Sequence, residues 1–191
     1  MTGRLIFVSS VMNAGKTARL IQLNFDYSRI GKKVITLKPS HDTRSNTIKS
    51  RNGLEVACKT IHSTDELKRQ NFDSVDILLI DEAQFLTADE VDYLRNLSLD
   101  LPIIIYCFGL KSDFMGNLFD GSKRLIEVCD KIEELSTLCL CGREAVMNLK
   151  YDNRTGKVLK KGEVVECGGD DMYMPVCYRH WTVDNIEAIH T

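Results

Sequence analysis

The first group of residues that could do chemistry is the run SSVMNAGKTARL, residues 9–20. Gly15, Lys16 and Thr17 match the end of the phosphate-loop pattern G-x-x-x-x-G-K-[ST], in which backbone N–H groups at a helix N-terminus surround phosphate oxygens. The lysine of this pattern contacts the terminal phosphates, and the threonine hydroxyl binds Mg²⁺. Ser10 stands where the pattern has its first glycine, so we expect a strained backbone there. The run predicts a site for a nucleoside triphosphate with Mg²⁺.

A pair of acids, Asp81 and Glu82, follows the apolar run ILLI. An aspartate at the end of a buried strand is typical of the second Mg²⁺-binding motif of nucleotide-binding proteins. Glu82 could take a proton from an attacking group, which would be water in an ATPase and a substrate hydroxyl in a kinase. The letters DEAQ also match the D-E-A-x box of helicases, so an ATP-driven motor stays an alternative. The residues predicted to contact ATP are Ser10, Val11, Met12, Asn13, Ala14, Gly15, Lys16, Thr17, Asp81, Glu82, Ala83 and Gln84, with Thr17 and Asp81 at the Mg²⁺ ion.

The C-terminal quarter contains two close pairs of metal-binding side chains. Cys139-x-Cys141 and Cys177-x-x-His180 are separated by 35 residues. Thiolates and imidazole are the ligands of tetrahedral zinc, and four protein ligands make a structural site because no position is left for water or substrate. Ordinary buried thiols are the plainer alternative. A zinc ribbon that binds nucleic acid is another, although the acidic segment GEVVECGGDDMYMP disfavours contact with a phosphate backbone.

Apolar runs and helical segments alternate over the first part of the chain. This pattern predicts an α/β fold, a P-loop NTPase-type parallel sheet flanked by helices. After about residue 138 the sequence changes to short alternating segments with a turn at residues 153–156. This pattern predicts a small C-terminal zinc-binding β-ribbon domain. We therefore expect an ATP-binding domain over 1–137 and a zinc-ribbon domain over 138–191. The expected elements are strands at 4–10, 32–38, 76–81 and 101–108, helices at 16–30 and 87–97, and a long mobile loop at 40–53.

Bulk properties restrict the possible partners. With a net charge of −2, the chain as a whole does not attract nucleic acid or an anionic membrane electrostatically, so neither is expected as a partner. No run of 18 apolar residues is present, so no spanning helix is expected. Seven cysteines, an odd number without a secretion signal, indicate the reducing cytoplasm rather than a disulfide scaffold.

Taken together, the motifs resemble the type II, zinc-containing thymidine kinases. The resemblance covers nearly the whole chain, and the family also contains members with serine at the position of Ser10. The segments that carry it, in the order of the family, are SVMNAGKT, HDTRSNTIKSR, LLIDEAQFL, YCFGLKSDFMGNLFDGS, LCLCGREA and VVECGGDDMYMPVCYRH.

The resemblance implies transfer of the γ-phosphoryl group of Mg²⁺-bound ATP to the 5′-hydroxyl of thymidine, in the salvage route to dTTP and DNA synthesis. It places the catalytic base on Glu82 and one structural Zn²⁺ on Cys139, Cys141, Cys177 and His180. It also implies feedback inhibition by dTTP and a homotetramer.

The resemblance further implies a lid that closes over the thymine base, with bends at glycines 168 and 169. Family members often carry more apolar residues at positions 166 and 167. Asp42 and Arg44 match a loop near the 5′-hydroxyl. The implied thymidine-binding residues are Met12, Phe85, Leu110, Phe114, Phe119, Val164, Val165, Glu166, Cys167, Gly168 and Tyr173.

Overall fold

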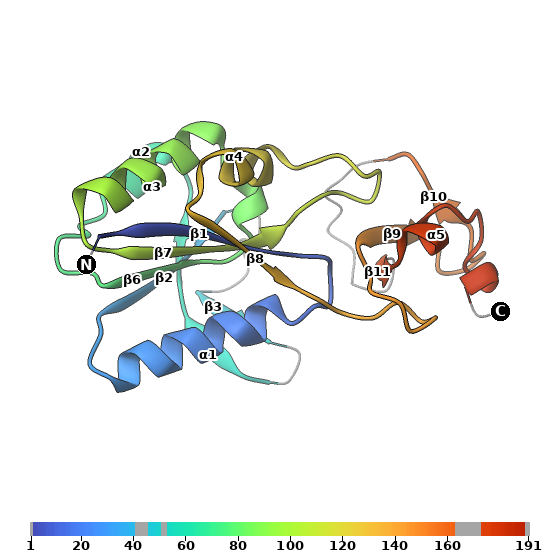
Figure 1. The fold of residues 1–191 in the computed structure, drawn as a ribbon, viewed down its shortest axis with the longest axis horizontal. Helices are drawn as coiled ribbons and strands as arrows, with labels where there is room; N and C mark the ends of the chain where they lie inside the picture. The colour runs from blue at the N-terminus through green and yellow to red at the C-terminus, as the bar shows by residue number, and fades with distance from the viewer. Residues whose placement is uncertain (1, 41–45, 51–52, 163–172, 190–191) are drawn as a thin grey trace.

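A six-stranded, wholly parallel sheet forms the centre of the molecule (Figure 1). The computed structural model describes residues 2–40, 46–50, 53–162 and 173–189. Strands covered on both faces read as continuous apolar runs, and this is why the segments RLIFV and ILLI form two of the interior strands. The strand order is β5 (Lys59–Ile61), β2 (Val34–Pro39), β6 (Ile77–Ile80), β7 (Ile104–Leu110), β1 (Arg4–Ser10) and β8 (Lys131–Leu135).

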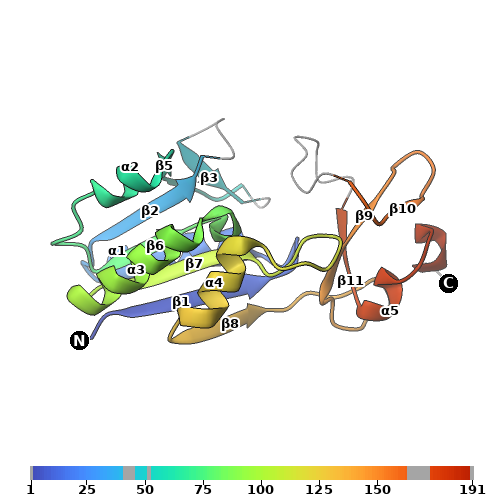
Figure 2. The ribbon, with the colours of Figure 1, turned by 90° about the horizontal axis from the view of Figure 1, so that it is seen from above.

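Helices cover both faces of this sheet. One face packs on α1 (Lys16–Arg29) through Leu20 and Leu23. The other face, on the opposite side in Figures 1 and 2, is covered by α2 (Thr64–Lys68), α3 (Ala88–Asp100) and α4 (Asp120–Val128). None of the helices in the described part of the chain has the length and apolar character needed to cross a membrane. The predicted α/β class with a parallel sheet is confirmed.

Local signals correctly placed α1 and α3, whereas α2 and α4 were not predicted. Gly31, which has a left-handed φ of 80°, follows the end of α1 as expected. Thr87 caps α3: its Oγ1 accepts a hydrogen bond from the Glu90 N–H at 3.2 Å, and the Glu90 carboxylate accepts one from the Thr87 N–H at 2.9 Å. This reciprocal pair is the predicted capping box.

The prediction of a long loop over residues 40–53 was wrong for its described part. Thr47–Lys49 forms β3, which pairs antiparallel with β4 (Glu55–Ala57). Ile48, only 4% exposed, packs against the cluster beneath α1. Val56 of β4 packs against the same cluster, so one apolar side chain from each strand docks this hairpin. Such a signal is too short for a periodicity argument.

The last part of the chain builds a small module of its own. It contains an antiparallel sheet in the order β10 (Val158–Leu159), β9 (Met147–Tyr151) and β11 (Tyr173–Val176). Leu149 and Val176 form the centre of its core. Two short helical segments, α5 (Tyr178–Trp181) and η3 (Ile186–Ile189), follow it. We call the described residues 138–162 and 173–189 the C-terminal module.

Candidate active site

The loop between β1 and α1 carries the predicted phosphate-binding pattern. Its left-handed residues are Asn13, with φ 63°, and Gly15, with φ 83°. Asparagine adopts this region more readily than most residues. The strain that we expected at Ser10 is absent, because Ser10 is the last residue of β1 and its hydroxyl donates a 2.8 Å hydrogen bond to the Val11 carbonyl. A serine therefore fits this position as part of a strand.

A cavity of about 440 Å³ lies against this loop, within the usual range for a small-ligand site. Its lining joins the loop to the acidic pair through Glu82 and to β7 through Leu110. Sequence reasoning missed Lys49 and Ser50, which enter the lining from the end of the β3–β4 hairpin. The available signal was a lysine beside a hydroxyl residue in the polar run. The lining consists of Met12, Asn13, Gly15, Lys16, Thr17, Ala18, Lys49, Ser50, Glu82 and Leu110.

Glu82 is held in an unusual backbone conformation immediately after β6. Its φ of 52° lies in the left-handed region, and non-glycine residues held there are concentrated at functional sites. Its N–H donates to Asp81 Oδ1 at 3.0 Å. Gln84 Nε2 donates to Glu82 Oε2 at 2.5 Å, while Gln84 Oε1 accepts from the Leu110 N–H at 3.1 Å. The buried Gln84 thus ties the Glu82 carboxylate to β7.

The charges of this site perturb one another. Burial, and then the neighbouring Glu82 carboxylate, raise the pKa of Asp81 from 3.8 to about 7. Burial lowers the pKa of Lys16, against the opposing effect of Glu82 and Asp81. A carboxylate that is 5% exposed is costly to ionise without a cation. The donor set therefore fits a hard divalent cation, which carboxylate and hydroxyl oxygens would hold.

We expect the Mg²⁺-free, nucleotide-free protein to lose stability as the pH rises from about 4 to about 7 and to change little above that range. The pKa of Asp81 is raised in the folded state, so the contribution of its neutral form is fully present below about pH 4. It is lost progressively up to about pH 7, because the unfolded chain ionises over this range while the folded protein stays protonated. Thermal unfolding followed from pH 5.5 to 8.5, with zinc retained, would measure the decline. Asp81→Asn should flatten the profile, and Mg²⁺ should restore stability to the unsubstituted protein at pH 8. A decline of equal size in the variant would contradict this assignment.

The described residues among those predicted to bind thymidine, which we call the proposed nucleoside wall, fall into three groups. Met12 and Leu110 line the cavity. Phe85 and Phe119 form an edge-to-face pair with ring centroids 5.8 Å apart, and Phe114 and Tyr173 form another at 6.3 Å. The predicted positions Val164, Val165, Glu166, Cys167 and Gly168, the glycine at 169, and Asp42 and Arg44 lie outside the described residues.

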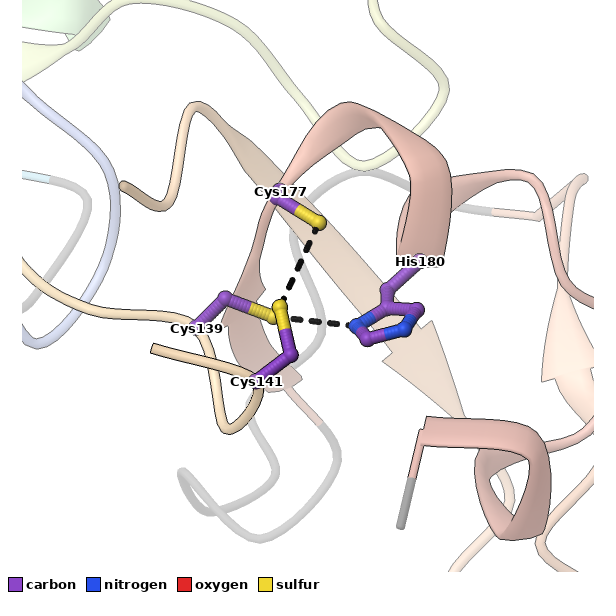
Figure 3. Close-up of side chains that lie close together, drawn as sticks. All are labelled: Cys139, Cys141, Cys177 and His180. Atoms are coloured by element: carbon purple, nitrogen blue, oxygen red, sulfur yellow. Dashed lines mark hydrogen bonds between the residues drawn. The ribbon is translucent and has the colours of Figure 1, made fainter. Parts of the chain in front are cut away.

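The four predicted zinc ligands converge on one point (Figure 3). Cys139 Sγ lies 3.2 Å from His180 Nδ1, and Cys141 Sγ lies 3.9 Å from Cys177 Sγ. All four ligand atoms fall within 4.8 Å of one another. Zn–S bonds of about 2.3 Å place tetrahedral sulfur ligands roughly 3.8 Å apart, so the cluster has the chemistry and size for zinc.

Comparison with known proteins gives a consistent result. The thymidine kinase family model matches residues 3–181. The thymidine kinase of Encephalitozoon cuniculi (strain GB-M1) is 41% identical over 187 residues, 94% of this chain and 87% of that protein. The thymidine kinases of Rhodopirellula baltica, at 38% identity over 93% of this chain and 87% of that protein, and Photobacterium profundum, at 39% over 93% and 96%, are similar throughout.

Among solved structures, the Pif1 helicase from Candida albicans aligns with 70% of this chain and 36% of its own, at a TM-score of 0.44 and 16% identity. A similarity this low bears on neither fold nor function. The family match, by contrast, extends from β1 to the end of α5. The chain therefore belongs to the thymidine kinase family.

Proposed function

We propose that this chain transfers the γ-phosphoryl group of ATP to the 5′-hydroxyl of thymidine, forming thymidine 5′-monophosphate. Membership of the thymidine kinase family supports the reaction. The observation that carries the chemistry is that Lys16 of the phosphate loop and Glu82 line the same cavity. Lys16, a cation that can bind the phosphates, and Glu82, a carboxylate that can accept the hydroxyl proton, thus face the same cavity.

The proposed step is an in-line displacement. The 5′-oxygen of thymidine bonds to the γ-phosphorus, the bond from that phosphorus to the β–γ bridging oxygen breaks, and ADP leaves. Glu82 accepts the hydroxyl proton. Backbone N–H groups before α1, together with Lys16, stabilise the charge on the phosphate oxygens. Lys49 is placed to add a second cation at the cavity.

Two metal ions complete the proposal. Thr17 and Asp81 would hold Mg²⁺, which neutralises phosphate charge when bound. The Cys₃His cluster would hold one structural Zn²⁺, because four protein ligands close the coordination shell.

The remaining features are proposals that rest on the family resemblance. Met12, Phe85, Leu110, Phe114, Phe119 and Tyr173 would surround the nucleoside, and the segment around 164–175 would close over the base. Asp42 and Arg44 would lie near the 5′-hydroxyl. We further propose feedback inhibition by dTTP, a homotetramer, a cytoplasmic location, a role in dTTP salvage and a domain boundary near residue 138.

A direct assay tests the proposal. Zinc-loaded protein with Mg²⁺ and ATP should convert thymidine to thymidine 5′-monophosphate, detected by chromatography. Folded, zinc-loaded protein that forms no product would refute it. Thymidine-independent ATP hydrolysis stimulated by DNA or RNA would instead indicate a motor. Salt-sensitive nucleic-acid binding without turnover would indicate a zinc-ribbon binder.

A further inference from the structure

Asn148 connects the C-terminal module to two loops of the ATP-binding part. It lies on β9 and is 2% exposed. Its Oδ1 accepts a hydrogen bond from the Met12 N–H at 2.8 Å, and its Nδ2 donates one to the Ser112 carbonyl at 3.0 Å. One amide group thus joins the phosphate loop, β9 and the segment that follows β7.

An amide is the side chain that this junction requires. It offers an acceptor and a donor at one tip, whereas a carboxylate offers acceptors only and an aliphatic side chain offers neither. The Ser112 residue is 6% exposed, so its carbonyl has little access to water as a substitute partner. Losing Asn148 would leave a buried backbone group without its partner, and the local structure would shift to satisfy it.

The same face of β9 also contacts the proposed nucleoside wall. Residues two apart on a strand share a face, so Lys150 lies beside Asn148. The Lys150 ammonium lies 5.0 Å from the ring centroid of Phe114 and 5.6 Å from that of Tyr173. Trp181 Nε1 adds a 2.9 Å hydrogen bond to the Phe114 carbonyl. The C-terminal module therefore holds Met12 on one side and the Phe114 segment on another.

We propose that Asn148 is a positioning residue for phosphoryl transfer. It sets the phosphate loop, through Met12, against the segment that carries Phe114, so that the nucleoside and the γ-phosphate meet at Glu82. The inference rests on the thymidine kinase reaction proposed above. A misplacement of about 1 Å can reduce a rate about 100-fold, so a pair of backbone contacts is sufficient to matter.

The test compares Asn148→Ala and Asn148→Asp with Asn185→Ala. Asn185 is a matched control because its amide also makes two backbone contacts in the C-terminal module, to the Thr155 carbonyl and the Glu187 N–H, both far in the chain from the phosphate loop. Each protein is assayed for thymidine phosphorylation, for total ATP hydrolysis, for zinc content and for thermal unfolding.

We expect Asn148→Ala to lower kcat/KM for thymidine about 10- to 100-fold and to raise the amount of ATP hydrolysed per thymidine phosphorylated, with zinc content unchanged. Asn148→Asp keeps an acceptor for the Met12 N–H but sets a buried carboxylate against the Ser112 carbonyl oxygen, so it should lose at least as much activity. Asn185→Ala should retain the unsubstituted kinetics. Loss of zinc or of folding in both Asn148 variants, or unaltered kinetics in Asn148→Ala, would overturn the proposal. An unsubstituted protein that forms no thymidine monophosphate would refute the proposed function instead.

Discussion

Glu82→Gln is expected to lower the kcat for thymidine phosphorylation by about 10²–10⁴-fold, the usual contribution of a positioned base. ATP binding should persist, because the phosphate loop and Lys16 are untouched and the carbonyl oxygen of the introduced amide can still accept the hydrogen bond from Gln84 Nε2. Single-turnover phosphorylation gives the rate, and equilibrium binding of a non-hydrolysable ATP analogue gives the affinity. A slow chemical step with intact nucleotide binding would isolate the role of the carboxylate.

Glu55→Gln provides the matched control for this substitution. Glu55 is an exposed residue of β4 in the β3–β4 hairpin, so its replacement removes the same charge outside the cavity lining. We expect its kcat to stay within about twofold, as is usual for a surface substitution with small energetic effect. If both variants slowed equally, net charge would explain the loss. If Glu82→Gln turned over at the unsubstituted rate, Glu82 could not be the base.

The parts of the fold that the sequence predicted are those set by local pattern. An apolar run followed by AGKT and an amphipathic segment predicts strand, loop and helix, and β1 and α1 occupy those residues. Thr87 and Glu90 marked the start of α3, because a capping box involves residues only three apart. The Cys₃His cluster could also be predicted from the sequence, because each ligand pair lies within one short segment and coordination chemistry selects the residue types.

The features that the sequence did not predict depend on tertiary contacts. Asn148 meets Met12 across 136 positions of the chain, and no local pattern marks such a pairing. The Gln84 bridge to Leu110 depends on the close packing of β7, where a Cβ at Gly109 would lie 3.0 Å from Gln84 Oε1. The left-handed backbone of Glu82 is likewise set by its surroundings, because intrinsic preference opposes it.

Cys177→Ser is expected to abolish zinc retention and thymidine phosphorylation together. The core of the C-terminal module is small, and two of its buried members, Cys139 and Cys177, are themselves proposed zinc ligands. A cluster of this size depends on metal binding for much of its folding free energy, as small zinc domains do. Replacing a residue that only hydrogen-bonds to a metal ligand typically lowers metal affinity about 10- to 100-fold. Cys177→Ser removes a ligand itself, so we expect the zinc affinity to fall further. Elemental analysis should find about one zinc per chain before the change.

The loss of activity should follow from the contacts of the module rather than from the metal itself. When the module unfolds, the Asn148 contact to Met12 and the Trp181 contact to Phe114 are lost, so both sides of the proposed nucleoside wall move. The six-stranded sheet has a separate core beneath α3 and should remain folded, so far-UV circular dichroism should fall only in part. Cys129→Ser, a half-buried thiol outside the cluster, should retain zinc and activity. A zinc-free Cys177→Ser protein with unchanged thymidine turnover would show that phosphoryl transfer does not require a folded C-terminal module.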